Sequence, residues 1–172
     1  MMDASSGSRI VVMGVSGCGK STLGRALAQR LSLPYIEGDE LHPPRNIALM
    51  AAGTPLTDED RACWLQAIAE RLAAAGSTGA VVACSALKRS YRDLLRASAP
   101  NLRLVHLSGP ESVLMQRMHA RSGHYMPPSL LRSQLDTLQP PCADEHAVVL
   151  NIESPLEQML DAICRQWDIP GA

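Results

Sequence analysis

The stretch GVSGCGKS at residues 14–21 decides the fold that we expect of this chain. It follows an apolar run, RIVVM at 9–13, that is typical of a strand, and it leads into a helical pattern at 20–31. The stretch matches G-x-x-x-x-G-K-[ST], a pattern that in a strand–loop–helix context indicates a phosphate-binding loop. Glycines allow successive backbone N–H groups to turn toward one anion, and the next helix directs its positive end at the same point. These residues therefore predict a site for a nucleoside triphosphate.

Individual roles within the loop follow from side-chain chemistry. Lys20 would supply a mobile cation to the phosphates, and the Ser21 hydroxyl would ligate Mg²⁺. The dinucleotide-binding pattern G-x-G-x-x-G does not fit, because the glycines stand in a different order and a lysine follows them. The residues of this segment that we expect to bind the nucleotide are Gly14, Val15, Ser16, Gly17, Cys18, Gly19, Lys20, Ser21 and Thr22.

Composition restricts the class of protein. The chain has 172 residues, of which 46% are hydrophobic, and its formal charge is −1. This length suits one compact α/β domain, so we expect a single domain over 1–172. The near-neutral charge argues against nucleic acid or an anionic membrane as a partner. The five cysteines are widely spaced and include no CxxC pair, which argues against a disulfide framework or a structural zinc site.

No segment of the sequence indicates export or membrane insertion. The N-terminal stretch MMDASSGSR has no apolar core, unlike a secretory signal peptide. No apolar stretch reaches the length that is needed to span a membrane. We therefore expect a soluble cytoplasmic protein that acts on a small molecule and has no membrane partner.

Apolar runs alternate with helical patterns along the rest of the chain. We expect strands at 9–13, 34–38, 80–85, 102–108 and 147–152. We expect helices at 20–31, 45–53, 57–76, 87–98, 111–122 and 129–139, and a last helix that carries Leu156, Met159, Leu160 and Ile163 on one face. Continuous apolar strands separated by helices indicate a parallel sheet that is covered on both sides. The predicted fold class is α/β, with a five-stranded parallel sheet between two layers of helices.

Polar residues follow two of the predicted strands, at the edge where ligands bind in an open parallel sheet. After the strand at 34–38, Asp39 is placed to orient or deprotonate an attacking hydroxyl, or to hold water on Mg²⁺. A solvated acidic turn is the alternative explanation. After the strand at 80–85, Lys88 and Arg89 are candidates for binding an anionic group of the acceptor. A basic face in solvent is the alternative there.

A further candidate segment lies at 122–139, where glycine and two prolines interrupt the helical pattern. We expect this segment to form a mobile lid, which Arg117, Arg121 and His124 bracket. Arginines that close over the phosphates would stabilise the migrating group and help to exclude water. Arg117 and Arg121 are therefore expected to bind the nucleotide.

Seven stretches, in order from residue 10 to about 155, resemble the gluconate kinases, a family of small P-loop kinases that make 6-phosphogluconate. They are VVMGVSGCGKSTLG, GDELHPPRN, GTPLTDEDRACWL, CSALKRSYRDLLR, LSGP, RSGHYMP and SQLDTLQPPCADE. The first is shared by many kinases, whereas the second, third and fourth together are far more specific. The resemblance implies ATP-dependent phosphorylation of D-gluconate to 6-phospho-D-gluconate, with Mg²⁺, by a homodimer. It also implies a P-loop kinase fold in which the strand at 80–85 lies beside the strand at 9–13.

The resemblance also implies roles for individual residues. Lys20, Asp39 and Arg121 would be catalytic, with Asp39 at the acceptor site and Arg121 as the lid arginine near the phosphates. The residues expected to contact the acceptor are Asp39, His42, Arg45, Lys88, Arg89 and His124.

Two other hypotheses stay open at this point. The chain could phosphorylate another small hydroxy acid, such as shikimate. It could instead be a nucleotide-dependent regulatory switch, although the sequence contains no guanine-recognition motif such as NKxD. A nucleoside monophosphate kinase is disfavoured, because the SALKRSYRD block at 85–93 stands in place of that family's acceptor signature.

Overall fold

Five parallel strands form one sheet in the computed structural model, which describes residues 7–121 and 127–170. They are β1 (Arg9–Met13), β2 (Tyr35–Glu37), β3 (Ala80–Ala83), β4 (Arg103–Ser108) and β5 (Val148–Asn151). Their order across the sheet is β2-β3-β1-β4-β5, and every neighbouring pair is parallel. β3 lies beside β1, with Val11 opposite Val82. The predicted number and direction of the strands and the predicted pairing of these two are confirmed.

Seven α-helices lie between or after these strands within the described residues. They are α1 (Lys20–Leu31), α2 (Pro44–Ala51), α3 (Asp58–Ala75), α4 (Arg89–Ser98), α5 (Glu111–Ala120), α6 (Ser129–Thr137) and α7 (Leu156–Gln166). Two 3₁₀ turns are also present. The first, η1 (Gly38–Leu41), begins at the last residue of the strand predicted at 34–38 and continues into the loop expected after it. The second, η2 (Ala143–Glu145), lies in a segment that we expected to be a loop. None of the helices in residues 7–121 and 127–170 has the length and apolar character that a membrane span requires.

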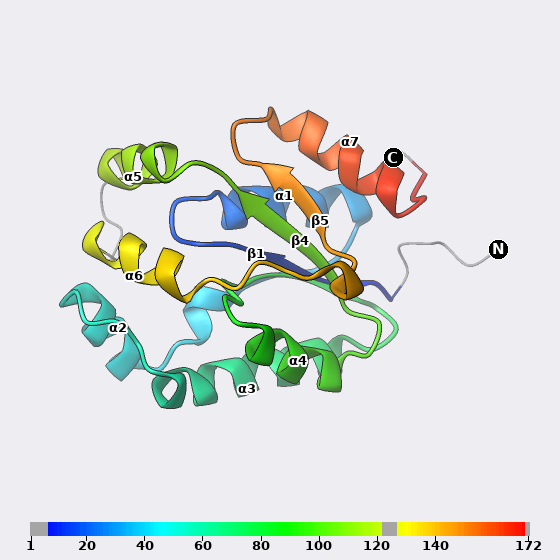
Figure 1. The fold of residues 1–172 in the computed structure, drawn as a ribbon. Coiled ribbons are helices and arrows are strands. Elements are labelled where there is room, and N and C mark those ends of the chain that lie inside the picture. Colours follow the sequence, from blue (N-terminus) through cyan, green and yellow to red (C-terminus); the bar gives the residue numbers. More distant parts are fainter. Residues whose placement is uncertain (1–6, 122–126, 171–172) are drawn as a thin grey trace.

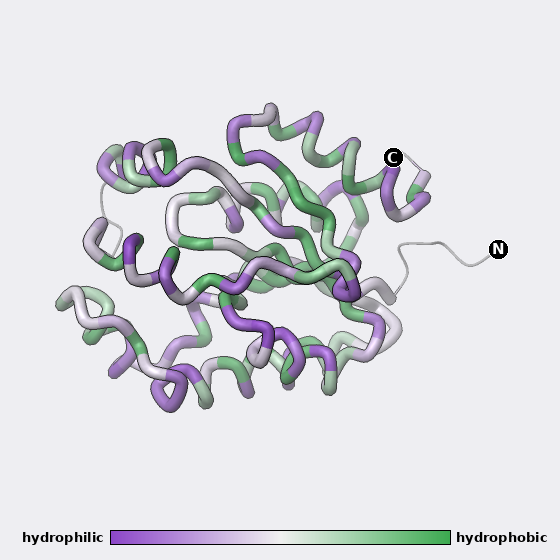
Figure 2. Tube along the Cα trace, viewed as in Figure 1, coloured by the Kyte–Doolittle hydropathy of each residue, from purple (hydrophilic) through white to green (hydrophobic). Residues whose placement is uncertain are grey.

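Helices cover both faces of the sheet, which gives the predicted three layers (Figure 1). On one face α3 and α4 pack through Trp64 and Leu95, and on the other α1 and α7 pack through Leu27 and Ile163. Alternate residues of β1 contribute to the two hydrophobic clusters. The hydrophobic strands accordingly lie between helices whose outer turns are more hydrophilic (Figure 2). Burial on both faces explains why the strands read as continuous apolar runs rather than alternating ones.

The connection between β3 and α4 differs from our expectation. The strand predicted at 80–85 ends earlier, at Ala83, and the next helix begins later than predicted, at Arg89. Ala86 has a φ of 43°, in the left-handed region, so the backbone turns there and continues neither as strand nor as helix. This turn holds Ser85 at the carboxyl edge of the sheet, where the candidate site lies.

The predicted lid at 122–139 is described only in part. Residues 122–126 lie outside the described residues, and so does the predicted site residue His124. Within the described part, α6 packs Leu131 into the hydrophobic core, where it is 0% exposed. The mobility of this segment stays a prediction.

Candidate active site

The phosphate-binding loop at 14–21 joins β1 to α1 at the carboxyl edge of the sheet. α1 begins at Lys20, directly after Gly19, whose φ of 94° is one that residues with a side chain rarely adopt. This turn sets the loop against the positive end of α1, which favours an anion there. The Lys20 ammonium group donates a hydrogen bond to the Val15 carbonyl oxygen at 3.1 Å, so the side chain folds back over the loop.

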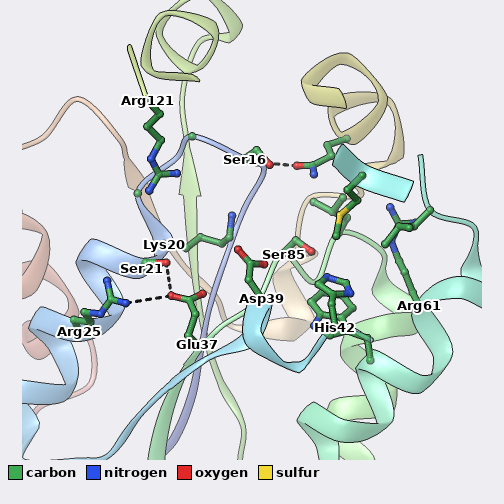
Figure 3. A pocket seen from close by; sticks show the side chains of 17 residues that line it. Ser16, Lys20, Ser21, Arg25, Glu37, Asp39, His42, Arg61, Ser85 and Arg121 are labelled. Carbon is green, nitrogen blue, oxygen red and sulfur yellow. Dashed lines mark hydrogen bonds and ion pairs between the residues drawn. The ribbon is translucent and has the colours of Figure 1, made fainter. Parts of the chain in front are cut away.

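A cavity of about 280 Å³ opens beside this loop, and Figure 3 shows the side chains that line it. Of the predicted site residues, Lys20, Ser21, Asp39, His42 and Arg121 all line it. The complete lining is Ser16, Gly17, Gly19, Lys20, Ser21, Arg25, Glu37, Asp39, His42, Met50, Leu56, Arg61, Trp64, Ser85, Leu87, Arg121 and Gln134. The fold therefore brings residues that we predicted to bind phosphate and several that we predicted to bind the acceptor into one cavity.

Three other predicted acceptor residues, Arg45, Lys88 and Arg89, do not line this cavity. Each forms an ion pair with a carboxylate instead. The carboxylates are those of Asp60, Asp58 and Asp144, at N–O distances of 2.5, 2.9 and 2.5 Å in that order. Contact of these three basic residues with an acceptor stays a prediction. In this conformation the basic residues that line the cavity are Lys20, Arg25, Arg61 and Arg121.

Part of the predicted nucleotide-binding set also lies outside the cavity lining. Thr22 is exposed on α1, and Arg117 donates a hydrogen bond from α5 to the Ile152 carbonyl oxygen at 2.8 Å. Val15 and Cys18 belong to the loop, but their side chains point into the core and are 3% and 2% exposed. Only the backbone groups of these two loop residues are therefore suited to a phosphate.

Glu37, for which no role was predicted from the sequence, lies beside Ser21, the predicted Mg²⁺ ligand. The Ser21 hydroxyl donates to its Oε2 at 2.6 Å, the Tyr35 hydroxyl donates to the same oxygen at 2.7 Å, and Arg25 lies 3.7 Å away. Burial and the hydrogen bond to Glu37 raise the pKa of Tyr35, so this hydroxyl keeps its proton. The available signal was the position of Glu37 at the end of β2, in the same acidic stretch as Asp39.

Asp39 is held at the cavity by the packing of its neighbour Gly38. A Cβ atom on Gly38 would lie 2.2 Å from the Ala83 carbonyl oxygen, so only glycine allows η1 to approach β3 this closely. The Trp64 indole N–H donates to the Gly38 carbonyl oxygen at 2.8 Å and attaches the turn to α3. The acidic stretch is thus a fixed turn, and its carboxylate at position 39 lines the cavity.

His42 is a neutral group in the wall of the cavity. Its ring stacks on Trp64 with centroids 4.2 Å apart, and its Nδ1 lies 3.3 Å from the Asn46 side-chain amide. Burial, together with the nearby positive charge of Arg61, lowers the pKa of His42 to about 4. With Nδ1 accepting from Asn46, the protonated nitrogen is Nε2, which makes the neutral ring a hydrogen-bond donor.

This lowered pKa predicts a pH dependence of stability. In the unfolded chain His42 takes up a proton at its ordinary pKa of 6.5, whereas in the fold it resists protonation until about pH 4. The unfolded state therefore binds more protons in that window, and the free energy of unfolding falls as the pH drops through it. His42→Gln should weaken this fall, as measured by urea unfolding at pH 7 and pH 5. An equal fall in both proteins would contradict the assignment, since every other titrating group is shared.

Two further polar residues, Gln134 and Arg61, line the cavity but were not predicted from the sequence. Gln134 of α6 accepts a hydrogen bond from the Ser16 backbone N–H at 2.7 Å, which links α6 to the phosphate loop. Arg61 of α3 lines the cavity and donates to the Tyr91 hydroxyl at 3.1 Å. Both residues are far in sequence from the residues that they contact, so no local sequence motif could predict their place in the cavity.

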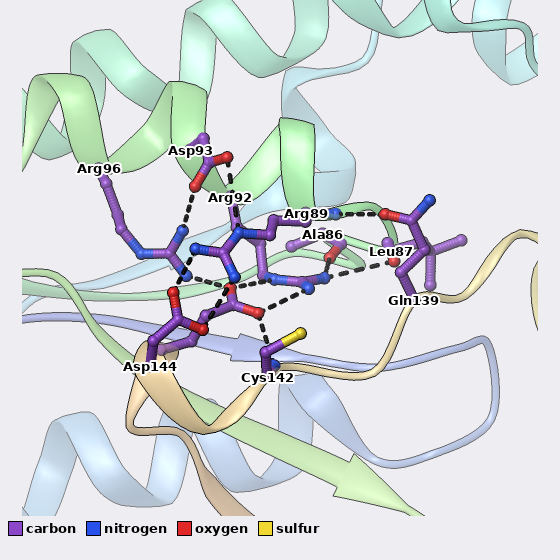
Figure 4. Close-up of polar contacts among 10 residues, drawn as sticks. Ala86, Leu87, Arg89, Arg92, Asp93, Arg96, Gln139, Cys142 and Asp144 are labelled. Atoms are coloured by element: carbon purple, nitrogen blue, oxygen red, sulfur yellow. Dashed lines mark hydrogen bonds and ion pairs between the residues drawn. The ribbon is translucent and has the colours of Figure 1, made fainter.

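A buried ion cluster fixes the β3–α4 connection behind the cavity (Figure 4). Arg92 is 0% exposed and its Nε and Nη2 bind the two Glu145 carboxylate oxygens at 2.7 and 3.0 Å. Arg92 also donates to the Ala86 and Leu87 carbonyl oxygens at 2.9 and 3.3 Å. Burial opposes ionisation of Glu145, but hydrogen bonds from Arg92, the Cys142 backbone and Arg96 outweigh it and lower its pKa to about 2. The cluster therefore holds the turn that carries Leu87 to the cavity.

The fold and the loop together define a P-loop kinase. A family model described as an AAA domain matches residues 10–141. The thermoresistant gluconokinase of Escherichia coli is 47% identical over 150 residues, which cover 86% of this chain and 86% of that protein. The chain belongs to the gluconokinase family.

Solved structures agree with this membership. A sugar kinase from Janibacter is 45% identical, with a TM-score of 0.90 and coverage of 95% of both chains. A gluconokinase from Sinorhizobium meliloti is 52% identical, with a TM-score of 0.85 and coverage of 94% of this chain and 91% of that one. The likeness to a shikimate kinase from Bacteroides thetaiotaomicron has a TM-score of 0.70 at 18% identity, so it concerns the fold alone.

Proposed function

We propose that this chain transfers the γ-phosphoryl group of ATP to the terminal hydroxyl of D-gluconate, which gives 6-phospho-D-gluconate. The observation that carries the proposal is that Lys20 of the phosphate loop and Asp39 of η1 line one cavity in a member of the gluconokinase family. Neither shikimate phosphorylation nor a regulatory role gains support of this kind, since the shikimate kinase likeness is one of fold.

The nucleotide phosphates would bind to the loop amides at 14–21. Lys20 and Arg121 line the same cavity and would stabilise the negative charge that spreads over the migrating phosphoryl group. Thr22 and Arg117 would complete the nucleotide site at its margins. Because the protein forms no covalent bond to the phosphoryl group, it would contribute mainly by positioning the reactants and by stabilising negative charge.

The residues present fit a Mg²⁺ ion. The Ser21 hydroxyl and the Glu37 carboxylate are joined by a hydrogen bond of 2.6 Å, and Asp39 lines the same cavity. Mg²⁺ is usually held by one or two carboxylates together with substrate phosphates and water. When bound, the ion would neutralise charge on the β- and γ-phosphates. Glu37 would accept the hydrogen bond from the Ser21 hydroxyl, so that the hydroxyl lone pairs face away from Glu37 and remain available to the ion.

Asp39 would position the attacking hydroxyl. Phosphoryl transfer has a loose transition state, in which the attacking oxygen has lost little of its proton. A carboxylate that accepts a hydrogen bond from this hydroxyl therefore contributes chiefly by orientation and only secondarily as a base. The neutral His42 ring would donate a hydrogen bond to another acceptor hydroxyl in the same cavity.

The Asp39→Asn variant tests this assignment. The amide keeps the size of the side chain but loses the negative charge, so kcat/KM for D-gluconate should fall by roughly tenfold or more. ATP affinity should remain close to that of the wild type, because the loop at 14–21 is unchanged. Coupled measurement of ADP release and calorimetric titration of ATP report the two quantities separately. A wild-type kcat/KM would show that Asp39 is only a turn residue, and a wild-type enzyme that releases no ADP with gluconate would refute the proposed function itself.

Several wider features also belong to the proposal. We propose that the segment at about 122–139 acts as a lid; the hydrogen bond from the Ser16 backbone N–H to Gln134 supports its contact with the phosphate loop, and Leu131 would anchor it to the core. A single domain over 1–172, a homodimeric assembly and a cytoplasmic location follow from composition and from the family resemblance. Contacts of His124, Arg45, Lys88 and Arg89 with the acceptor are retained as proposals for the closed state.

A further inference from the structure

The cavity has two chemically different sides. In Figure 3 the phosphate loop with Lys20 and Arg121 lies on one side, Arg61 lies on the other, and Asp39 and Ser85 stand between them in this view. Cations on the loop side would serve the nucleotide phosphates. Arg61 is set apart from them, so its charge is placed for a different anionic group.

Among the described residues Arg61 forms no ion pair, unlike several of its neighbours, and its charge acts on the Asp58 carboxylate only through space. Among the described residues, Arg25 pairs with Glu37, and Arg45 and Lys88 pair with aspartates. The guanidinium of Arg61 instead bonds to the hydroxyl of Tyr91, a neutral partner, and lies 5.6 Å from the centroid of that ring. One edge of a five-donor group is fixed in this way, which leaves further N–H groups for a ligand.

A chain of hydrogen bonds supports Arg61 from behind. Tyr91 is buried at 5% exposure and donates its hydroxyl proton to Asp58, which Lys88 binds at 2.9 Å. This chain of contacts ties α3 to α4 and holds the guanidinium at the cavity wall. An arginine that is oriented before the ligand arrives loses little side-chain freedom on binding.

The surroundings of Arg61 would strengthen an ion pair. Met50 and Leu56 line the same cavity, are 4% and 7% exposed, and form a small hydrophobic cluster with Leu130 of α6. Charges attract more strongly beside such a low-dielectric wall than in open water. The combination of a fixed guanidinium and an apolar wall suits a carboxylate, which arginine binds through two parallel hydrogen bonds.

We propose that Arg61 binds the carboxylate of the sugar acid and thereby sets the direction in which the acceptor lies in the cavity. The assignment rests on the proposed function. With the carboxylate at Arg61, the opposite end of the polyol chain is directed toward Asp39 and the phosphate loop. The site thus selects an aldonic acid over a neutral sugar and presents its terminal hydroxyl for transfer.

Kinetics with a charged and a neutral acceptor test the inference. The acceptors are D-gluconate and D-gluconamide, which share the polyol chain and differ in the carboxylate. In the wild type kcat/KM should favour gluconate by roughly 10- to 150-fold, the range for a hydrogen bond to a charged group. Arg61→Met should raise the KM for gluconate by a similar factor, leave the KM for ATP nearly unchanged, and bring the two acceptors close to parity. Arg61→Lys keeps the charge without the planar fork and should give an intermediate preference.

The matched control is Arg71→Met, since Arg71 is an exposed arginine on the same helix that does not line the cavity. It should keep the wild-type preference. Near-ultraviolet circular dichroism and Tm identify any variant that fails to fold, and the conservative Arg61→Lys change keeps the test decisive in that case. If the wild type phosphorylates gluconate but both Arg61 variants retain its preference over gluconamide, the inference is wrong while the proposed function stands. A wild type that is inactive on gluconate removes the proposed function first.

Discussion

Lys20→Ala is expected to lower kcat for gluconate phosphorylation by roughly a hundredfold or more, the loss that follows removal of one preorganised electrostatic donor. Lys20 stands at the start of α1, where the loop amides and the helix end already favour phosphate. Those groups remain in the variant and continue to bind the ground-state nucleotide. The lysine charge matters more once negative charge develops on the β–γ bridge, so the effect should appear in kcat more than in ATP affinity.

The measurement is kcat at saturating ATP and gluconate, with ATP affinity from calorimetry. Loss of the ammonium group also removes its 3.1 Å hydrogen bond to the Val15 carbonyl oxygen. The Tm of the variant must therefore be compared with that of the wild type, to separate a loss of stability from a loss of catalysis. Arg71→Ala supplies the control, because it removes a positive charge from an exposed position outside the cavity. A kcat within a few-fold of the wild type, in folded protein, would show that the loop amides and the metal suffice without Lys20.

The sheet could be predicted from the sequence because its signals are local. Each strand is a short apolar run followed by a break, and a parallel sheet needs such runs to be buried on both faces. The start of α3 was also readable from the sequence, since Thr57 is a residue type suited to cap a helix, and in the structure it forms a capping box with Asp60. The end of β3 was not, because the turn at Ala86 depends on Arg92 of α4, whose side chain binds the carbonyl oxygens there.

The site could be predicted only where it follows the strand ends. Lys20 ends the loop that follows β1, and Asp39 lies in the turn that follows β2, so the topology alone brings them to one edge of the sheet. Arg61 lies within a helix, and its place at the cavity depends on packing against Tyr91, thirty residues further along. Lys88 and Arg89 have the expected position after β3, but they pair with Asp58 and Asp144 from distant segments and do not line the cavity. Sequence proximity identifies the edge of the sheet, whereas tertiary packing decides which cation reaches the ligand.

Glu145→Ala should destabilise the fold by about 3–5 kcal/mol, the usual cost of removing one partner from a buried ion pair. Arg92 and Glu145 have side-chain exposures of 0% and 1%, so water cannot replace the lost carboxylate. The variant leaves the Arg92 guanidinium charged and without its anionic partner. It also removes the hydrogen bond of 2.8 Å that the Cys142 backbone N–H donates to the Glu145 carboxylate. Urea unfolding at pH 7 measures the loss as a lower transition midpoint.

Asp144→Ala provides the matched control for Glu145→Ala, since it truncates the adjacent acidic residue. Asp144 also pairs with an arginine, Arg89, but the two side chains are 61% and 40% exposed. Solvent screens such a pair and solvates the arginine that remains, so this variant should unfold at nearly the wild-type urea concentration. The double variant Arg92→Leu with Glu145→Leu should recover part of the stability that Glu145→Ala loses, because no uncompensated charge is left inside. Equal destabilisation by the two single variants would contradict the account, because it would mean that burial of the Arg92–Glu145 pair does not set its energetic importance.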